Sequence, residues 1–139
     1  MVDQVASIAI RLVIIAIVLV AVFAGRALLR QLQAVRRQRV LQGRAHPEMS
    51  QGERTVLLFT GTLCSDCIRQ KDALTALNGS AGHFRVNEVM AAREPDLAGQ
   101  FGVQSVPATV ILDGDGKPVA VNYGFVTGAV IASQLAKAG

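Results

Sequence analysis

The chain has 139 residues, of which 51% are hydrophobic and 17% charged, and its formal net charge is +4. This length allows one small domain and an accessory segment, which excludes a multidomain enzyme. The hydrophobic excess is concentrated in residues 5–25, so the chain from about Glu48 onward has the composition of an ordinary globular domain.

The charge is unevenly distributed. Residues 1–47 carry seven Arg and one Asp, whereas residues 48–139 carry seven Lys or Arg and nine Asp or Glu. The Arg residues flank an apolar segment, a position where positive side chains interact with anionic lipid headgroups and set the orientation of a membrane segment. No basic face or aromatic platform accompanies them, so we expect the lipid bilayer as a partner and no nucleic acid.

A transmembrane helix is predicted over residues 5–26, after a short tail of residues 1–4. The run from Leu12 to Ala24 is apolar without a helical period. About 20 helical residues span roughly 30 Å, the thickness of the bilayer interior. Arg11 lies close enough to the start for its long stem to reach the interface.

A cleaved signal peptide is the alternative, with Val22-Phe23-Ala24 near a possible cleavage point. Signal peptides begin with a positive region, but only Asp3 is charged before Arg11. The positive cluster instead follows the apolar run, at Arg26, Arg30, Arg36, Arg37, Arg39 and Arg44. The flanks favour a single-pass anchor in the cell membrane, with the N-terminus outside and the domain in the cytoplasm. An extracytoplasmic domain is the alternative.

Residues 27–52 are predicted as a basic juxtamembrane helix followed by a linker, and residues 53–139 as the folded domain. The pattern of the domain predicts the order β-α-β-α-β-β-α in a mixed sheet. The expected elements are strand 55–59, helix 64–77, strand 84–89, helix 94–101, strand 108–112, strand 118–121 and a closing helix capped by Thr127.

Two local expectations accompany these elements. In helix 64–77 we expect Ile68, Leu74 and Leu77 to face inward as an apolar stripe. Residues 113–117 read Asp-Gly-Asp-Gly-Lys but lack the remaining ligands of a calcium loop and the pattern of a phosphate loop, so a tight turn is predicted.

Cys64 and Cys67 are the candidate catalytic residues. At spacing i, i+3 they lie on one side of the start of a helix, close enough for a disulfide. The helix N-terminus favours a thiolate, the attacking species, so Cys64 is expected to be the exposed nucleophile. Cys67 would then be the resolving thiol.

A metal site is the competing interpretation, because His46 and His83 complete a set of two Cys and two His. Zinc sites of this composition usually hold their ligands in closely spaced pairs, and these two His are isolated. We therefore predict neither a metal nor a cofactor.

Residues 54–137 resemble the thioredoxin family. Val56-Leu-Leu-Phe59 is similar to its strand before the Cys-x-x-Cys helix, and Phe101-Gly-Val-Gln-Ser-Val-Pro107 to its segment before the final hairpin. The resemblance implies a cis peptide between Val106 and Pro107 that shapes the substrate-docking edge beside the Cys pair. Residues 45–54 are too few for the family's additional N-terminal strand and helix, so a minimal thioredoxin-like fold is expected.

Three departures from the family pattern concern the site. Leu63 replaces a Trp, Ser65-Asp66 replaces Gly-Pro, and Leu58 stands where the family buries an Asp that accepts a proton from the resolving thiol. Cys67 would then need water or Asp66 as the acceptor. Asp66 also opposes thiolate formation at Cys64, so Ser65 and Asp66 are expected to modulate the pair toward a reducing or mid-range couple.

The resulting functional hypothesis is a membrane-tethered thiol-disulfide oxidoreductase. Its partners would be a membrane-associated protein disulfide as substrate and a cellular thiol reducing system. Two alternatives remain open. One is a non-catalytic binding module, with or without a metal on the Cys pair. The other is a glutaredoxin-like glutathione-dependent enzyme, with which Ser105-Val106-Pro107 is compatible.

Overall fold

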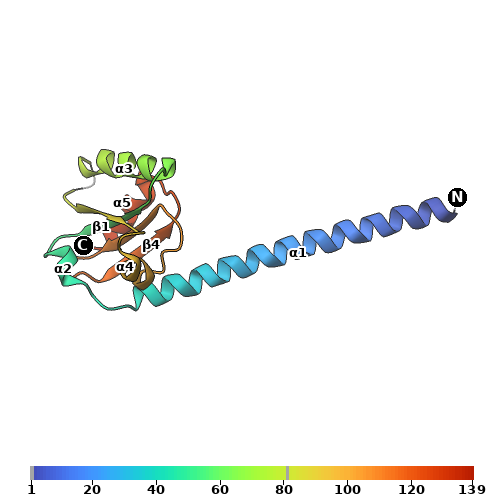
Figure 1. Ribbon diagram of the computed structural model, residues 1–139, viewed down its shortest axis with the longest axis horizontal. Coiled ribbons are helices and arrows are strands. Elements are labelled where there is room, and N and C mark those ends of the chain that lie inside the picture. Colours follow the sequence, from blue (N-terminus) through green and yellow to red (C-terminus); the bar gives the residue numbers. More distant parts are fainter. Residues whose placement is uncertain (1, 81) are drawn as a thin grey trace. The chain divides into compact units, whose positions relative to one another are not determined.

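The computed structural model describes residues 2–80 and 82–139 and divides the chain into two compact units, one ending at Val35 and one from Arg36 to Gly139 (Figure 1). The second unit has the predicted β-α-β-α-β-β-α order, preceded by the end of the first helix and by one short helical turn. The elements are α1 (Val2–Leu41), α2 (Pro47–Ser50), β1 (Thr55–Thr60), α3 (Ser65–Asn78), β2 (Arg85–Met90), α4 (Pro95–Gln100), β3 (Ala108–Leu112), β4 (Pro118–Tyr123) and α5 (Gly128–Lys137).

The first unit is the long part of α1. This helix contains a stretch, with a mean hydropathy of 2.9, that is long and apolar enough to cross a membrane. Its large apolar side chains are exposed, for example Phe23 at 71% and Val20 at 68%. Exposure of so much apolar surface on one helix is unfavourable in water and favourable in lipid.

The four-stranded sheet has the order β2-β1-β3-β4. β1 pairs in parallel with β2 and antiparallel with β3, and β4 pairs antiparallel with β3. Every residue of β1 and β3 is buried. Both strands are central and covered on both faces, which explains their continuous apolar sequences.

Each face of the sheet has its own apolar core. On one face Leu57 and Phe59 pack with Phe101 and residues around α4. On the other face Leu58 packs with Leu74 and with residues of α5, and Figure 1 shows α3 and α5 on this side. The second core uses the inward face of α3, and so it fixes the start of that helix against the end of β1.

The predicted apolar stripe of α3 is only partly correct. Leu74 is buried and Leu77 is half-buried, but Ile68 is 64% exposed. Gln70 occupies the inward position near the start of the helix and is fully buried. Ile68 instead lies beside the cysteines, on a side of α3 that faces solvent.

The folded unit begins at Arg36, earlier than the boundary at residue 53 drawn from the sequence. Val40, in the last turns of α1, is 6% exposed in the core, and Ser50 is fully buried. The His46 amide donates to the Gly116 carbonyl at 2.8 Å, and the Ser50 hydroxyl donates to the Gly114 carbonyl at 2.8 Å. These contacts join the segment before β1 to the turn between β3 and β4.

Residues 113–117 form the predicted turn. The carboxylate of Asp113 accepts hydrogen bonds from the amides of Asp115 at 3.0 Å and Lys117 at 2.9 Å. Thr127 occupies the predicted N-cap of α5, although its side chain makes no capping hydrogen bond. Its carbonyl accepts from the amides of Val130 and Ile131 instead.

Replacing Tyr123 with Phe is expected to lower the free energy of unfolding by about 1 kcal/mol, the usual contribution of one hydrogen bond. The Tyr123 hydroxyl donates to the Phe101 carbonyl at 3.0 Å. Burial raises the pKa of this phenol, an effect opposed by the nearby Arg36 and Arg37.

The same substitution has a pH signature. A raised folded-state pKa means that the contribution of Tyr123 is complete below the unfolded pKa of about 10 and is lost as the pH rises above it. Urea unfolding of the full chain in detergent, followed by circular dichroism from pH 7 to 11, should show a shallower alkaline decline for Y123F than for wild type. An equal decline of the free energy of unfolding with pH in the two proteins would contradict the raised pKa of Tyr123.

Candidate active site

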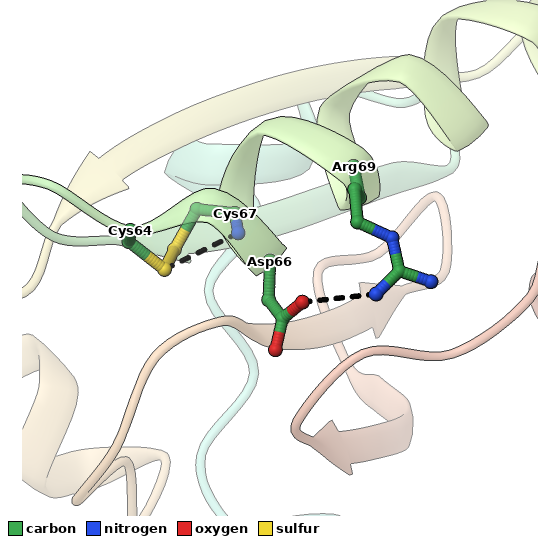
Figure 2. Close-up of a disulfide and its surroundings, with 4 residues drawn as sticks. All are labelled: Cys64, Asp66, Cys67 and Arg69. Carbon is green, nitrogen blue, oxygen red and sulfur yellow. Dashed lines mark hydrogen bonds and ion pairs between the residues drawn. A yellow bond between two sulfur atoms is a disulfide. The ribbon is translucent and has the colours of Figure 1, made fainter.

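The end of β1 and the start of α3 position the two cysteines. Cys64 is the N-cap residue of α3, with extended backbone angles, and its sulfur accepts a hydrogen bond from the Cys67 amide at 3.2 Å. Cys64 and Cys67 form a disulfide with 5.2 Å between their Cα atoms (Figure 2). The structure is therefore that of the oxidised form.

The two sulfurs differ in accessibility. Cys64 is half-buried, whereas Cys67 is 5% exposed. A disulfide is broken by in-line attack on one sulfur, so the more accessible sulfur is the one that a partner thiolate reaches. After reduction, the Cys67 amide and the N-terminus of α3 would favour the thiolate of Cys64.

Asp66 lies between the cysteines in sequence but interacts elsewhere. Its carboxylate accepts a hydrogen bond from the Arg69 guanidinium at 3.0 Å, and Figure 2 shows it turned toward that side chain. Arg69 also lies over the ring of Phe125, 4.4 Å from its centroid. The Arg69 charge compensates that of Asp66, which weakens the expected opposition to a thiolate at Cys64. Ser65 is exposed in the same turn.

The Val106–Pro107 peptide is cis, as the resemblance implied. Pro107 is buried, and its carbonyl accepts a hydrogen bond from the Gly124 amide at 2.8 Å. A Cβ added to Gly61 would lie 2.9 Å from a methyl group of Val106, so the absence of a side chain at Gly61 permits this close approach. Val106 is thereby held against the loop that leads to Cys64.

Two hollows meet at Thr60 and Gly61. One, of about 460 Å³, has Val106 in its wall and lies on the side of the cis peptide. The other, of about 550 Å³, reaches both cysteines and continues between α3 and β2. Its remaining lining residues are Leu63, Ser65, Ile68, Lys71, Glu88 and Met90.

Sequence reasoning did not identify the second hollow. Lys71 is four residues after Cys67, so helical spacing alone places both on one face of α3. Glu88 gave no such signal, because its position depends on strand pairing: it is the parallel partner of Leu58. Its carboxylate accepts from Lys71 Nζ at 2.7 Å.

Leu63 is unusual in both conformation and exposure. Its φ is +54°, in the left-handed region, and its side chain is fully exposed. A leucine in that conformation costs about 1 kcal/mol or more relative to a glycine. The result is an apolar side chain presented to solvent immediately before Cys64.

Leu58 occupies the place of the family's buried Asp and is fully buried. It belongs to an apolar cluster that includes Val56, Leu74, Phe84 and Ile131. The proton of Cys67 therefore has no acceptor at this position, as the sequence predicted.

The two His residues lie in unrelated settings. His46 Nδ1 is 3.0 Å from Glu48 Oε1, and its ring is 5.4 Å from that of Phe101. The pKa of the Glu48 carboxyl is lowered by a backbone hydrogen bond and by His46. His83 is exposed, and its carbonyl accepts a hydrogen bond from the Arg54 guanidinium at 3.3 Å. Within residues 2–80 and 82–139, no three His, Cys, Asp or Glu side chains gather in a way that would hold a metal.

Gln70 was missed because a polar residue does not ordinarily mark a buried position. It is fully buried, and its side chain forms two hydrogen bonds with the backbone of Val126. Gln70 Nε2 donates to the Val126 carbonyl at 3.1 Å, and Gln70 Oε1 accepts from the Val126 N–H at 2.8 Å. It thereby joins the first turns of α3 to the loop before α5.

Replacing Gln70 with Ala should destabilise the folded unit by about 1 to 3 kcal/mol, because two partly buried backbone groups of Val126 lose their hydrogen-bond partners. The fluorescence of the single tyrosine of the chain would follow urea unfolding. Thr75→Ala, an exposed change on α3, is the control. Equal unfolding midpoints for Q70A and T75A would refute the assigned role of Gln70.

The fold and the site together define a class of protein: a small α/β domain with a disulfide at a helix start and a cis-proline loop that contacts the segment leading to it. The chain belongs to the thioredoxin-like domain family, which residues 49–139 match. No curated protein matches the chain.

Solved structures agree with this assignment. Chloroplastic thioredoxin z is 25% identical, with a TM-score of 0.56, and the match covers 64% of this chain and 80% of that one. Mitochondrial thioredoxin 3 from Saccharomyces cerevisiae, in its oxidized form, is 22% identical, with a TM-score of 0.55 and coverages of 64% and 83%. Thioredoxin-2 of the malaria parasite is 22% identical, with a TM-score of 0.55 and coverages of 61% and 82%.

Proposed function

We propose that this protein is a membrane-tethered thiol-disulfide oxidoreductase that reduces or exchanges disulfides of partner proteins. The observation that carries the proposal is the Cys64–Cys67 disulfide at the start of α3, with the first sulfur accessible and the second covered. Two-step exchange uses one sulfur that a partner can reach and a second, covered sulfur nearby that attacks the first.

In the reducing direction the Cys64 thiolate attacks one sulfur of a partner disulfide. A mixed disulfide forms and the other partner sulfur leaves as a thiolate. Cys67 then loses its proton and attacks the Cys64 sulfur, which forms the Cys64–Cys67 disulfide and releases the second partner thiolate. The partner gains two electrons and the Cys pair loses two. A cellular thiol system restores the dithiol.

Membrane attachment through α1 supports a preference for membrane-associated partners. A tether raises the effective concentration of the domain toward such partners without any new contact. The excess of Arg after the apolar run supports a cytoplasmic domain, with the N-terminus outside. A reporter fused to Gly139 tests the orientation: activity of a periplasmic or extracellular reporter would overturn the cytoplasmic placement.

A redox titration of the full chain in glutathione buffers tests the exchange activity. The expected result is a reversible two-electron couple between the dithiol and the Cys64–Cys67 disulfide, with a reducing or mid-range potential. Thiols that show no couple, or that are protected by stoichiometric zinc, would overturn the proposal in favour of a tethered binding module. Exchange that requires glutathione would indicate the glutaredoxin-like activity.

A further inference from the structure

The hollow of about 550 Å³ beside the disulfide contains a second pair of functional groups. Of its ten lining residues, the only ionisable ones besides the cysteines are Lys71 and Glu88. The two side chains are 58% and 45% exposed, and they form an ion pair of 2.7 Å. The hollow is large enough to hold several water molecules, so it connects the covered sulfur of Cys67 to solvent.

The geometry of α3 directs Lys71 toward Cys67. Helical residues four apart lie on the same face, and long side chains of a helix point back toward its N-terminus. Lys71 and Cys67 therefore line the same hollow. In the oxidised form the Lys71 ammonium is held by Glu88, whose hydrogen bond raises the pKa of Lys71.

We propose that Lys71 is a positioning residue that stabilises the thiolate of Cys67 during the resolving step, and that Glu88 is the counter-ion that restrains it. This inference rests on the proposed function. When Cys67 gives its proton to water in the hollow, the Lys71 ammonium offsets the negative charge that forms on sulfur. Cys67 then attacks Cys64 as described above, and the released partner thiolate takes up a proton from solvent.

The surrounding charges favour this assignment over Asp66. Asp66 is paired with Arg69, and both side chains are more than half exposed. Asp72, next to Lys71 on α3, raises the Lys71 pKa slightly in the same direction as Glu88. From the end of β1, Thr60 and Gly61 contribute no charge to the hollow. A cation near a thiol lowers the thiol pKa, and an anion raises it.

The inference predicts opposite effects for the two members of the ion pair. In the full chain with Cys64→Ser, the pKa of the remaining Cys67 thiol is measured from thiolate absorbance and from the pH dependence of alkylation. K71Q should raise this pKa and E88Q should lower it, while K71R should leave it near its starting value. E94Q, an exposed carboxylate outside the hollow, is the matched control.

A kinetic measurement completes the test. With both cysteines present, K71Q should slow resolution of a Cys64 mixed disulfide with glutathione about 3- to 10-fold at pH 7, which corresponds to a shift of half to one pKa unit. Shifts of the same sign for K71Q and E88Q, or none in either, would overturn the inference. If the wild-type protein shows no reversible couple, the proposed function itself fails, so the two failures are distinguishable.

Discussion

Replacing Cys67 with Ser should trap the protein as a mixed disulfide on Cys64 and reduce turnover by roughly two orders of magnitude or more. The physical reason is the loss of an intramolecular attack. In the wild type Cys67, the resolving residue, lies in the first turn of α3 with its Cα atom 5.2 Å from that of Cys64. An external thiol at millimolar concentration cannot match the effective concentration of a group held in place.

The measurement is mass spectrometry of the full chain after incubation with a disulfide peptide, together with the rate of peptide reduction. C67S should retain one peptide per chain. C64S is the matched variant: its remaining sulfur is covered, so it should retain little peptide and show no turnover. Equal amounts of peptide retained by C67S and C64S would contradict the assignment of Cys64 as the nucleophile and Cys67 as the resolving residue.

Replacing Gly116 with Ala is the second change from which we expect a large effect. Gly116 has a φ of +78°, and a Cβ at this position would overlap the backbone of His46 and Pro47. The conformation costs an alanine about 1 kcal/mol or more, and the overlap adds the cost of moving a backbone segment. The expected loss in the free energy of unfolding is about 2 to 5 kcal/mol.

Urea unfolding followed by the fluorescence of Tyr123 measures this loss, because Tyr123 is the only tyrosine and the chain has no tryptophan. Gly79→Ala is the control, since Gly79 has a negative φ and an added Cβ would meet nothing within 4 Å. G79A should unfold within about 1 kcal/mol of the wild type. A G116A protein as stable as G79A would show that the segment before β1 does not depend on this contact.

The strands, helices and topology of the domain were predictable from the sequence because their signals are local. The apolar run before the cysteines, the Asp-Gly turn and the final amphipathic helix each specify one element. The position of Cys64 at the helix N-terminus and the cis peptide before Pro107 were also expected, the second from the resemblance alone. These features depend on residues that are neighbours in the chain.

The features that were missed depend on residues far apart in sequence. Val40 is buried by contacts with the domain, although the residues of the same helix from Ala6 to Arg39 are exposed and its neighbours have the composition of a basic spacer. Gln70 is buried because it completes the hydrogen bonding of Val126. Glu88 lies near the cysteines because β2 pairs with β1 in one particular register. No local pattern encodes such partners.

Ile68 illustrates a different difficulty. Helical periodicity identified it as an inward residue, but the covered face of α3 carries Cys67, Gln70 and Leu74, and Ile68 lies about 100° around the helix from Cys67. An apolar side chain there faces the hollow beside the disulfide. The periodicity of apolar residues gave the wrong face of this helix because a polar residue, Gln70, occupies one of its buried positions.

The small separation of the two cysteines, three positions along the chain, has a consequence for the lifetime of the protein. A crosslink that closes such a short loop restricts the unfolded chain less than a long one would, so it raises the free energy of unfolding by only about 2 kcal/mol. Reduction of the pair should therefore lower the melting temperature of the domain by several degrees. Each time the pair gives up its disulfide, the domain becomes the better substrate for proteases, and reoxidation reverses that change.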